Sequence, residues 1–359
     1  MSVYEERLTN DLSQIGDEIG TLGQMASRAV KESSRSLLEG KKQLANDTIL
    51  RDKPINRKRR EIIGHCIAFM AIHSPSASHL RQITAILRMA DNLERIGDHA
   101  VTIAREGIQL PHLPTGSIRD AMEAMAELAV AGLEDSLTAF KIKDAELAKK
   151  TSAMASQARI RQDGVFNELI IESDKEKIRY LFDMLITVAQ MKRINDRVKN
   201  LCEEAIFTAS GEVKIPRAYD ILFLDPSNNC QSQLAEAIAR KNFPKSGNYS
   251  SAGLRDETDL KPELHAFMES KGLVQGIVKP KRLDTDLAST GTYDIIVSLK
   301  GPVSNYIPKQ PFRSMFFEWD VGEEPENADA GELPYLTMYR EIKANVHDML
   351  VTLRGEAAK

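Results

Sequence analysis

The chain has 359 residues, enough for two or three domains, and its 28% charged residues and net charge of −4 give no overall basic bias toward nucleic acid. No apolar run approaches the roughly 20 residues that span a bilayer, so membrane insertion is not expected. The cysteines, Cys66, Cys202 and Cys230, are widely spaced and form no Cys/His cluster with zinc spacing, which indicates a reducing compartment and no disulfide scaffold.

The first half of the chain is predicted to be all-α. The N-terminal MSVYEERLTND lacks the basic and then apolar pattern of a signal peptide, so a cytoplasmic protein is expected. Apolar residues recur at helical spacing, and nothing before residue 212 has the pattern of a strand. A first helix is predicted at residues 1–40 and a second one after it, ending at about Leu50. Further helices are predicted at 56–72, 77–107, 117–141, 143–173 and 175–210.

One stretch, RMADNLERIGDHAVTIAR from Arg88 to Arg105, combines an apolar helix face with a line of acids. Asp91, Glu94 and Asp98 follow the edge of that face. A carboxylate beside an apolar face has to be hydrogen-bonded, paired or metal-bound to offset its desolvation. A merely solvated charged face is the competing interpretation, as is pairing of these acids with Lys192 or an arginine inside the bundle.

The motif recurs 98 residues further on, where Arg95-Ile96-x-Asp98 is matched by Arg193-Ile194-x-Asp196. A period of roughly 100 residues is too long for a solenoid unit. It indicates two similar three-helix bundles side by side, over residues 1–108 and 115–212.

The composition changes after Gly211, where strands begin to alternate with helices. Strands are predicted at 219–224, 247–252, 294–298 and 314–318, with helices opening at Ser232 and lying near 261–272 and 334–354. This alternation predicts one α/β domain with a parallel sheet and right-handed crossovers. The domains are therefore expected at 1–213 and 217–359, with a short join at about 211–216.

Residues 5 to 212 resemble the PhoU family of phosphate-uptake regulators, through Leu80-Arg81, the Asp91 to Ala100 run and its second copy. The resemblance implies a six-helix protein of two three-helix repeats. It also implies a cytoplasmic accessory regulator that works by protein–protein contact with a phosphate ABC transporter or a sensor histidine kinase, and it leaves a homodimer open. The outward-facing candidates for partner contact are Arg81, Arg88, Arg95 and His99, which have no evident folding role in the sequence.

Several members of that family bind multinuclear metal clusters through Glu-x3-Asp-x3-Asn, which lines up three oxygen ligands on a helix. The resemblance therefore implies divalent or ferric ions at Asp91, Glu94 and Asp98 in the first copy and at Asp196 and Asn200 in the second. Each copy departs once from the pattern. Thr102 still offers an oxygen in the first, but Lys192 puts a positive charge in the second, which weakens a cation site there.

Residues 218 to 355 resemble low-molecular-weight phosphotyrosine phosphatases and thioredoxin-coupled arsenate reductases. The resemblance is carried by ILFLDPSNNCQSQLAEAIAR, by Ser251-Ala252-Gly253, by the segment from Pro262 to Leu273 and by FEWDV from Phe317. Those families place a Cys-x5-Arg loop between a strand and a helix. Backbone N–H groups there cradle an oxyanion, a thiolate attacks it, and the arginine clamps it.

This chain departs at both decisive positions of the loop, with Asp225 for the nucleophile and Gln231 for the arginine. Asn228 and Ser232, which shape the loop, remain. Cys230 matches a second cysteine of some phosphatases and is expected to be a packed thiol, with a redox role as the alternative. The acid region near Glu323-Glu324-Pro325 also differs from the expected Asp-Pro.

The sequence therefore predicts a regulatory fusion whose phosphatase-like domain is catalytically inactive. Two alternatives stay open. One is an active phosphatase or arsenate reductase with altered residues, including an aspartyl-phosphate role for Asp225. The other is a metal- or anion-binding sensor.

Overall fold

The computed structural model divides the chain into two compact units, Met1–Lys214 and Ile215–Lys359. The structure describes residues 3–171, 178–212, 218–255, 259–273, 279–285, 292–308, 310–311, 314–322 and 333–358. Most of the predicted join and the acid region at 323–325 lie outside the described residues.

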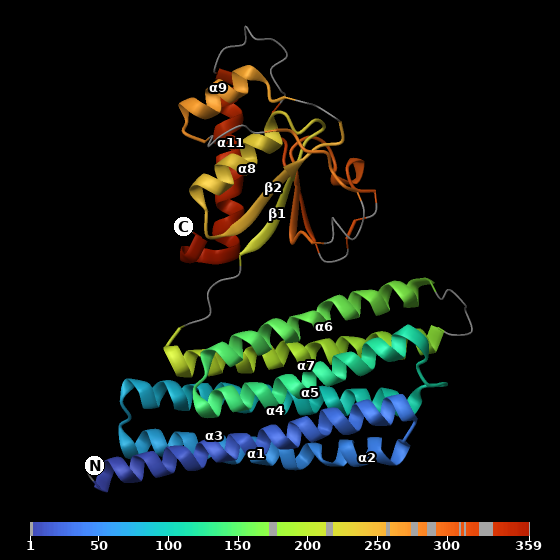
Figure 1. Cartoon of the computed structure of the whole chain (residues 1–359), viewed down its shortest axis with the longest axis vertical. Coiled ribbons are helices and arrows are strands. Elements are labelled where there is room, and N and C mark those ends of the chain that lie inside the picture. The colour runs from blue at the N-terminus through green and yellow to red at the C-terminus, as the bar shows by residue number, and fades with distance from the viewer. Residues whose placement is uncertain are drawn as a thin grey trace. The chain divides into compact units, whose positions relative to one another are not determined.

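The first unit is a bundle of long helices, as predicted (Figure 1). The helices of the first repeat are α1 (Val3–Glu39), α2 (Lys42–Leu50), α3 (Asp52–His73) and α4 (Ala77–Gln109). Those of the second are α5 (Gly116–Ile142), α6 (Ala145–Ile171) and α7 (Ile178–Ser210). The bundle is amphipathic throughout, and its buried side chains form a single apolar core drawn from both repeats.

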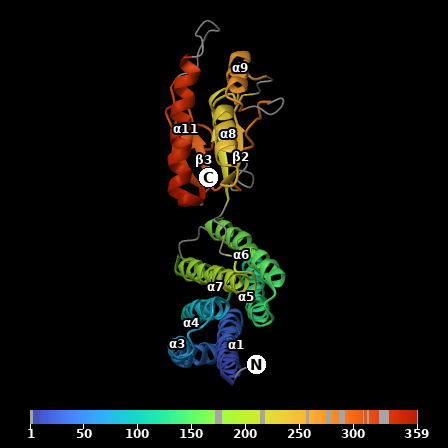
Figure 2. The same cartoon turned by 90° about the vertical axis from the view of Figure 1, so that its left-hand side faces the viewer.

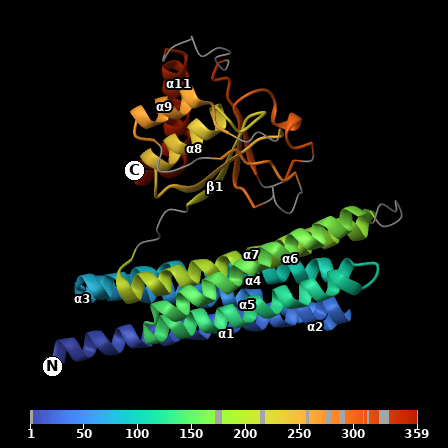
Figure 3. The same cartoon turned by 45° about the horizontal axis from the view of Figure 1, so that its top comes forward.

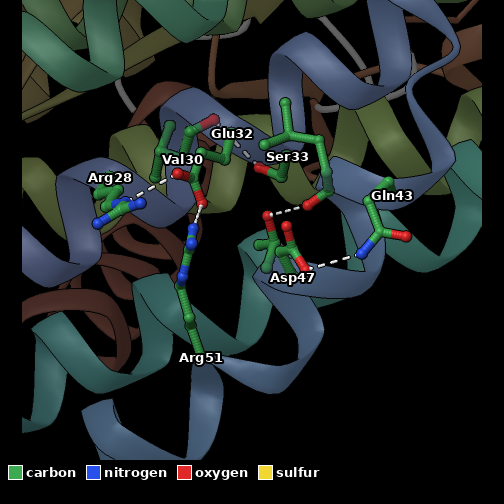
Figure 4. A network of polar contacts seen from close by, with 9 residues as sticks. Arg28, Val30, Glu32, Ser33, Gln43, Asp47 and Arg51 are labelled. Atoms are coloured by element: carbon green, nitrogen blue, oxygen red, sulfur yellow. Dashed lines mark hydrogen bonds and ion pairs between the residues drawn. The ribbon is translucent and has the colours of Figure 1, made fainter.

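The middle of the first repeat is interrupted at Arg51, so that it contributes α2 and α3 where the second repeat has one helix. Glu32 on α1 accepts hydrogen bonds from Arg28 (2.7 Å) and from Arg51 (Figure 4). This contact ties the α2–α3 junction to α1. The sequence predicts the next helix only from residue 56, but α3 begins at Asp52. Pro54 lies in its first turn, where the missing N–H has no helical partner to lose.

The two repeats meet along α4 and α7, which is seen most clearly along the helix axes in Figure 2. α4 also contacts α1, α2 and α3, and α7 also contacts α5 and α6. Each of the two motif helices thus packs within its own repeat and against the other. Within the second repeat, the close approach of α5 to α7 needs a small residue at the crossing. A Cβ on Gly132 of α5 would lie 2.7 Å from Val198 Cγ1 on α7.

The second unit contains a four-stranded parallel sheet in the order β2-β1-β3-β4. The strands are β1 (Tyr219–Leu224), β2 (Gly247–Ala252), β3 (Ile295–Ser298) and β4 (Met315–Glu318). The helices are α8 (Gln231–Asn242), α9 (Pro262–Ser270) and α11 (Leu333–Arg354), with short 3-10 turns at Val303–Asn305 and Gly355–Ala358. β1 lies between β2 and β3. The chain therefore passes from β1 to β2 on one side of it, and β3 is then added on the opposite side of β1.

The two faces of this sheet follow the period-2 alternation of the strands. Ile221 and Phe223 of β1 pack into a core with α8, α9 and α11, which lie on one side of the sheet (Figure 3). Leu222 and Leu224 face the opposite way and pack against Val303 and neighbouring residues. The carboxyl end of β1 therefore emerges between two buried layers, at the place where the strand order reverses.

Candidate functional site

The loop from Asp225 to Cys230 joins β1 to α8 at the carboxyl edge of the sheet. Asn228 has a φ of 51°, in the left-handed region, which turns successive backbone N–H groups inward. The segment after β2 packs directly on this loop. A Cβ on Gly253 would lie 2.5 Å from the backbone nitrogen of Asn228, so only glycine fits there.

Asp225 is fully buried at the floor of the loop, and its carboxylate accepts four hydrogen bonds. The backbone N–H groups of Ser227 (3.0 Å) and Asn228 donate to Oδ1. The backbone N–H of Ser232 (2.8 Å) and its hydroxyl (2.7 Å) donate to Oδ2. Both oxygens of this carboxylate are therefore engaged by the loop itself.

Asn228 and Ser232 shape the loop. The Asn228 amide donates to Ser232 Oγ (2.8 Å), and its Oδ1 accepts from the Gln233 side chain (3.0 Å) and the Lys281 backbone (2.7 Å). The loop is thereby held from the side of α8 and from the segment around residue 281. Gln233 and Lys281 are contributors that the sequence alone does not point to.

Gln231, at the position of the family's arginine, is fully buried and donates from Nε2 to the carbonyl of Gly322 at 2.7 Å. It brings no charge to the loop. Cys230 is also fully buried and belongs to the apolar core beneath α8.

The acids of the first repeat have different surroundings. Asp91 is half-exposed and forms an ion pair with Arg59 on α3 (2.6 Å). At this position the predicted line of acids is therefore a surface ion pair. Burial, followed by the neighbouring Asp98 charge, raises the pKa of Glu94, and burial followed by the Asp52 charge raises the pKa of Asp98. The sequence does not point to Asp52 as a neighbour of these acids. Its Oδ1 is buried with no hydrogen-bond partner.

The second repeat places its candidates apart. Lys192 pairs with Asp196 at 2.5 Å, and Asn200 donates to the side-chain oxygen of Asn92 on α4 at 3.2 Å. Lys192 thus pairs with the acid of its own repeat, whereas in the first repeat it is Asp91 that pairs with an arginine, Arg59. Across the described residues, no three His, Cys, Asp or Glu side chains gather closely enough to hold a metal ion.

The four predicted contact residues differ in their freedom. Arg88 pairs with Glu204 on α7 (3.1 Å) and lies over the Phe207 ring, so it does have a structural role, contrary to the expectation from sequence. His99 Nδ1 lies 2.8 Å from Gln190 Oε1, and burial together with Arg193, Arg197 and Arg95 lowers its pKa.

Arg81 and Arg95 complete the set. Arg81 is partly buried beside Gly211, and its Nε has no hydrogen-bond partner. Arg95 is exposed, and within the described part of the chain it makes no ion pair. Arg95 is therefore the contact candidate with the least evident role in folding.

No helix within the described ranges is both long and apolar enough to cross a membrane.

Comparison with known proteins divides the chain in the same way. The model of the PhoU domain matches residues 19–107 and 122–205, and that of the low molecular weight phosphotyrosine protein phosphatase matches residues 220–358. A phosphate-specific transport system accessory protein PhoU homolog from Xylella fastidiosa is 26% identical over 209 residues, which cover 58% of this chain and 88% of the relative. The homolog from Clostridium acetobutylicum is 28% identical over 206 residues, which cover 56% and 94%.

The crystal structure of PhoU from Pseudomonas aeruginosa matches with a TM-score of 0.55 and 25% identity, over 57% of this chain and 99% of that one. The corresponding protein of Streptococcus pneumoniae matches with a TM-score of 0.54 at the same identity, over 58% and 99%. The chain is thus a fusion of a PhoU domain with a domain of the low molecular weight phosphotyrosine protein phosphatase type.

Proposed function

We propose that this protein is an accessory regulator of phosphate transport that acts through contacts of its helical unit. The observation that carries the proposal is the match of this unit to almost the whole length of relatives named as accessory proteins of the phosphate-specific transport system. The proposed partners are a phosphate ABC transporter and a sensor histidine kinase that reports phosphate starvation.

The contact surface is proposed at the seam between α4 and α7. Arg95 and Arg193 are exposed there, 98 residues apart in the two copies of the motif, and Arg197 lies close enough to influence His99. The side chains of Arg95 and Arg193 are free to pair with acidic groups on another protein. Such exposed positive charges accelerate association with an acidic surface by electrostatic steering. A partner that meets this seam is expected to present carboxylates.

The test measures binding of the purified chain to the purified ATPase subunit of the transporter and to the kinase. Arg95→Glu is expected to weaken binding at least tenfold, with a steeper loss at low ionic strength. Arg60→Glu, an exposed arginine on α3, is the matched control for charge reversal. If a folded sample binds neither the ATPase subunit nor the kinase, the proposed function is contradicted.

The phosphatase-like unit is proposed to lack catalysis. Its support is chemical. A carboxylate with both oxygens engaged in four hydrogen bonds is a poor nucleophile, and Gln231 offers no charge to stabilise a phosphoryl transition state. The competing proposal is turnover by an altered enzyme, in which Asp225 attacks phosphorus.

A chromogenic phosphoester and arsenate with a thiol reductant separate the two proposals. The natural chain is expected to be silent, and the Asp225→Cys, Gln231→Arg double variant is expected to gain turnover. Turnover by the natural chain that Asp225→Ala abolishes would establish the altered enzyme instead.

A cation site in the first repeat is a second candidate, favoured by the unpartnered buried oxygen of Asp52 and by the influence of its charge on Glu94 and Asp98. These three side chains do not converge in the described structure, so the proposal requires them to move together around the ion. Carboxylate oxygens suit hard cations, and a bound cation would offset the desolvation of these acids. The second repeat does not fit, because Lys192 already neutralises Asp196.

Manganese, zinc and iron binding to the full chain, measured by calorimetry and by metal content, tests this candidate. At most one site per chain is expected, lost in the Glu94→Gln, Asp98→Asn variant and kept in Asp196→Asn. Equal loss in both variants contradicts the assignment to the first repeat.

A further inference from the structure

We propose that the Asp225 carboxylate is the resident anion of the loop between β1 and α8, so that the natural loop excludes phosphate and arsenate, and a chain without this carboxylate binds them. The inference rests on the proposed lack of catalysis in this unit and gives it a mechanism. The loop has kept its anion-binding architecture, but the occupant belongs to the chain.

The first step of the argument is the direction of the donors. Three backbone N–H groups and one hydroxyl converge on the two oxygens of Asp225, two donors on each. Inward-turned N–H groups ahead of a helix N-terminus are the general means by which proteins hold phosphate. Here the same kind of cradle closes on a side-chain carboxylate.

The second step is reach. An aspartate side chain ends in two oxygens one bond beyond the position of a cysteine sulfur, and these oxygens spread apart like two oxygens of a tetrahedral oxyanion. Asp225 thus places its charge and two acceptors further into the loop than a thiolate would. An external phosphate would meet this negative charge and find these donors already engaged.

The third step is that the cradle does not depend on Asp225 for its shape. Asn228 is bonded to Ser232, Gln233 and the Lys281 backbone, and the backbone N–H groups of Leu254 (3.0 Å) and Arg255 (3.1 Å) donate to the Pro226 carbonyl. These contacts brace the loop from outside. Removing the carboxylate is therefore expected to leave the donors close to their positions and without an acceptor.

The experiment titrates inorganic phosphate, and separately arsenate, into the full natural chain, the Asp225→Ala variant and the Asp348→Asn variant. Asp348 is exposed on α11, so its change removes one negative charge from the same unit and leaves the loop untouched. Calorimetry is expected to show binding to Asp225→Ala at least tenfold tighter than to the natural chain or to the control. Phosphate is also expected to raise the melting temperature of the alanine variant alone.

Two results overturn the proposal. One is saturable phosphate binding by the natural chain that shifts the amide resonances of Ser227, Asn228 and Ser232. The other is an equal absence of binding in the natural chain and in a folded Asp225→Ala chain, because the carboxylate would then not be what excludes the anion.

Hydrogen exchange on the natural chain keeps the test valid if the alanine variant does not fold. The amides of Ser227, Asn228 and Ser232 are expected to exchange at least tenfold more slowly than the amide of Lys300, an exposed residue of the same unit. Free exchange of these three amides contradicts the proposal. Phosphate binding in this loop by the natural chain, without turnover, would overturn this inference alone. Failure of the partner-binding test would overturn the regulatory role alone.

Discussion

Two glutamates of the helical unit lie in opposite electrostatic settings. Partial burial raises the pKa of Glu32, but hydrogen bonds and charges from Arg28 and Arg51 outweigh it and hold that pKa below the ordinary 4.5. A carboxylate whose pKa is lowered on folding stabilises the native state above its ordinary pKa, and this stability is lost as the pH falls.

Glu32→Gln is therefore expected to lower the free energy of unfolding of the helical unit by about 1–2 kcal/mol at pH 7. The difference from the natural chain should begin to shrink as the pH falls below the ordinary glutamate pKa and should vanish once the pH is below the lowered pKa of folded Glu32, because its side chain is then neutral like that of glutamine. Urea denaturation followed by circular dichroism between pH 3 and pH 8 measures both effects. A loss that is the same at pH 3 and pH 7 would contradict the electrostatic explanation.

Glu204 is predicted to behave in the opposite way. Burial is the main cause that raises its pKa, the nearby Arg88 opposes this, and Glu203 adds to it. The ionised form is thus less stable in the folded chain than in the unfolded one, and the stability present at low pH is lost as the pH rises above the ordinary value.

Glu204→Gln should raise the free energy of unfolding by up to about 1 kcal/mol at pH 7, with the gain disappearing on acidification. Arg88 tolerates the change because its side chain is 54% exposed and remains over Phe207. The same pH series of urea titrations measures the sign. A loss of stability at pH 7 would show that the ion pair outweighs the burial.

At the scale of the element, two glycines on helices have opposite roles. Gly132 lies where α5 crosses α7, and an added Cβ would press on the buried Val198. Gly20 on α1 faces open space, with no atom within 4 Å of an added Cβ.

Gly132→Ala is expected to cost about 1–3 kcal/mol through overpacking. Gly20→Ala should stabilise by about 0.5–1 kcal/mol, since alanine loses less backbone entropy in a helix. Thermal melting of both variants beside the natural chain measures the difference. Equal shifts of the two melting temperatures would contradict this description of the crossing.

The helices and strands were largely predictable because their signals are local. The periodicity over α1 and α4 fixes both elements to within a few residues, and the apolar runs locate all four strands. The start of α3 was not predictable, because the junction at Arg51 is held by Glu32 from another helix.

The same limit applies to the candidate site. The sequence identifies the loop and its altered residues, but it does not show that the donors close on Asp225, since this depends on the path of the backbone through Asn228. Nor does it place Asp52 near Glu94 or Gln190 against His99, because these pairs form only when helices pack.

At the scale of the whole molecule, each apolar core formed by the described residues is drawn from one unit alone, one core in the helical unit and two in the other. The three cysteines are buried in these cores, Cys66 and Cys202 in the helical unit and Cys230 in the other. Burial is the main cause that raises the pKa of Cys66 and of Cys202 to about 12, so few of these thiols are ionised at neutral pH.

Native protein is therefore expected to resist thiol reagents. In a urea series with pulsed alkylation, Cys66 and Cys202 should become reactive together, and Cys230 at a different urea concentration, as read by peptide mass spectrometry. Labelling of all three at one midpoint would show that the two units unfold as one.

The charge at Lys192 also makes the two repeats of the helical unit unequal. If the two copies of the motif were chemically identical, a partner could bind either copy equally well. The Lys192–Asp196 pair stands where the first repeat has Glu94 and Asp98, so the two copies are chemically distinct. We therefore expect a partner that distinguishes these charges to bind one copy of the motif in preference to the other.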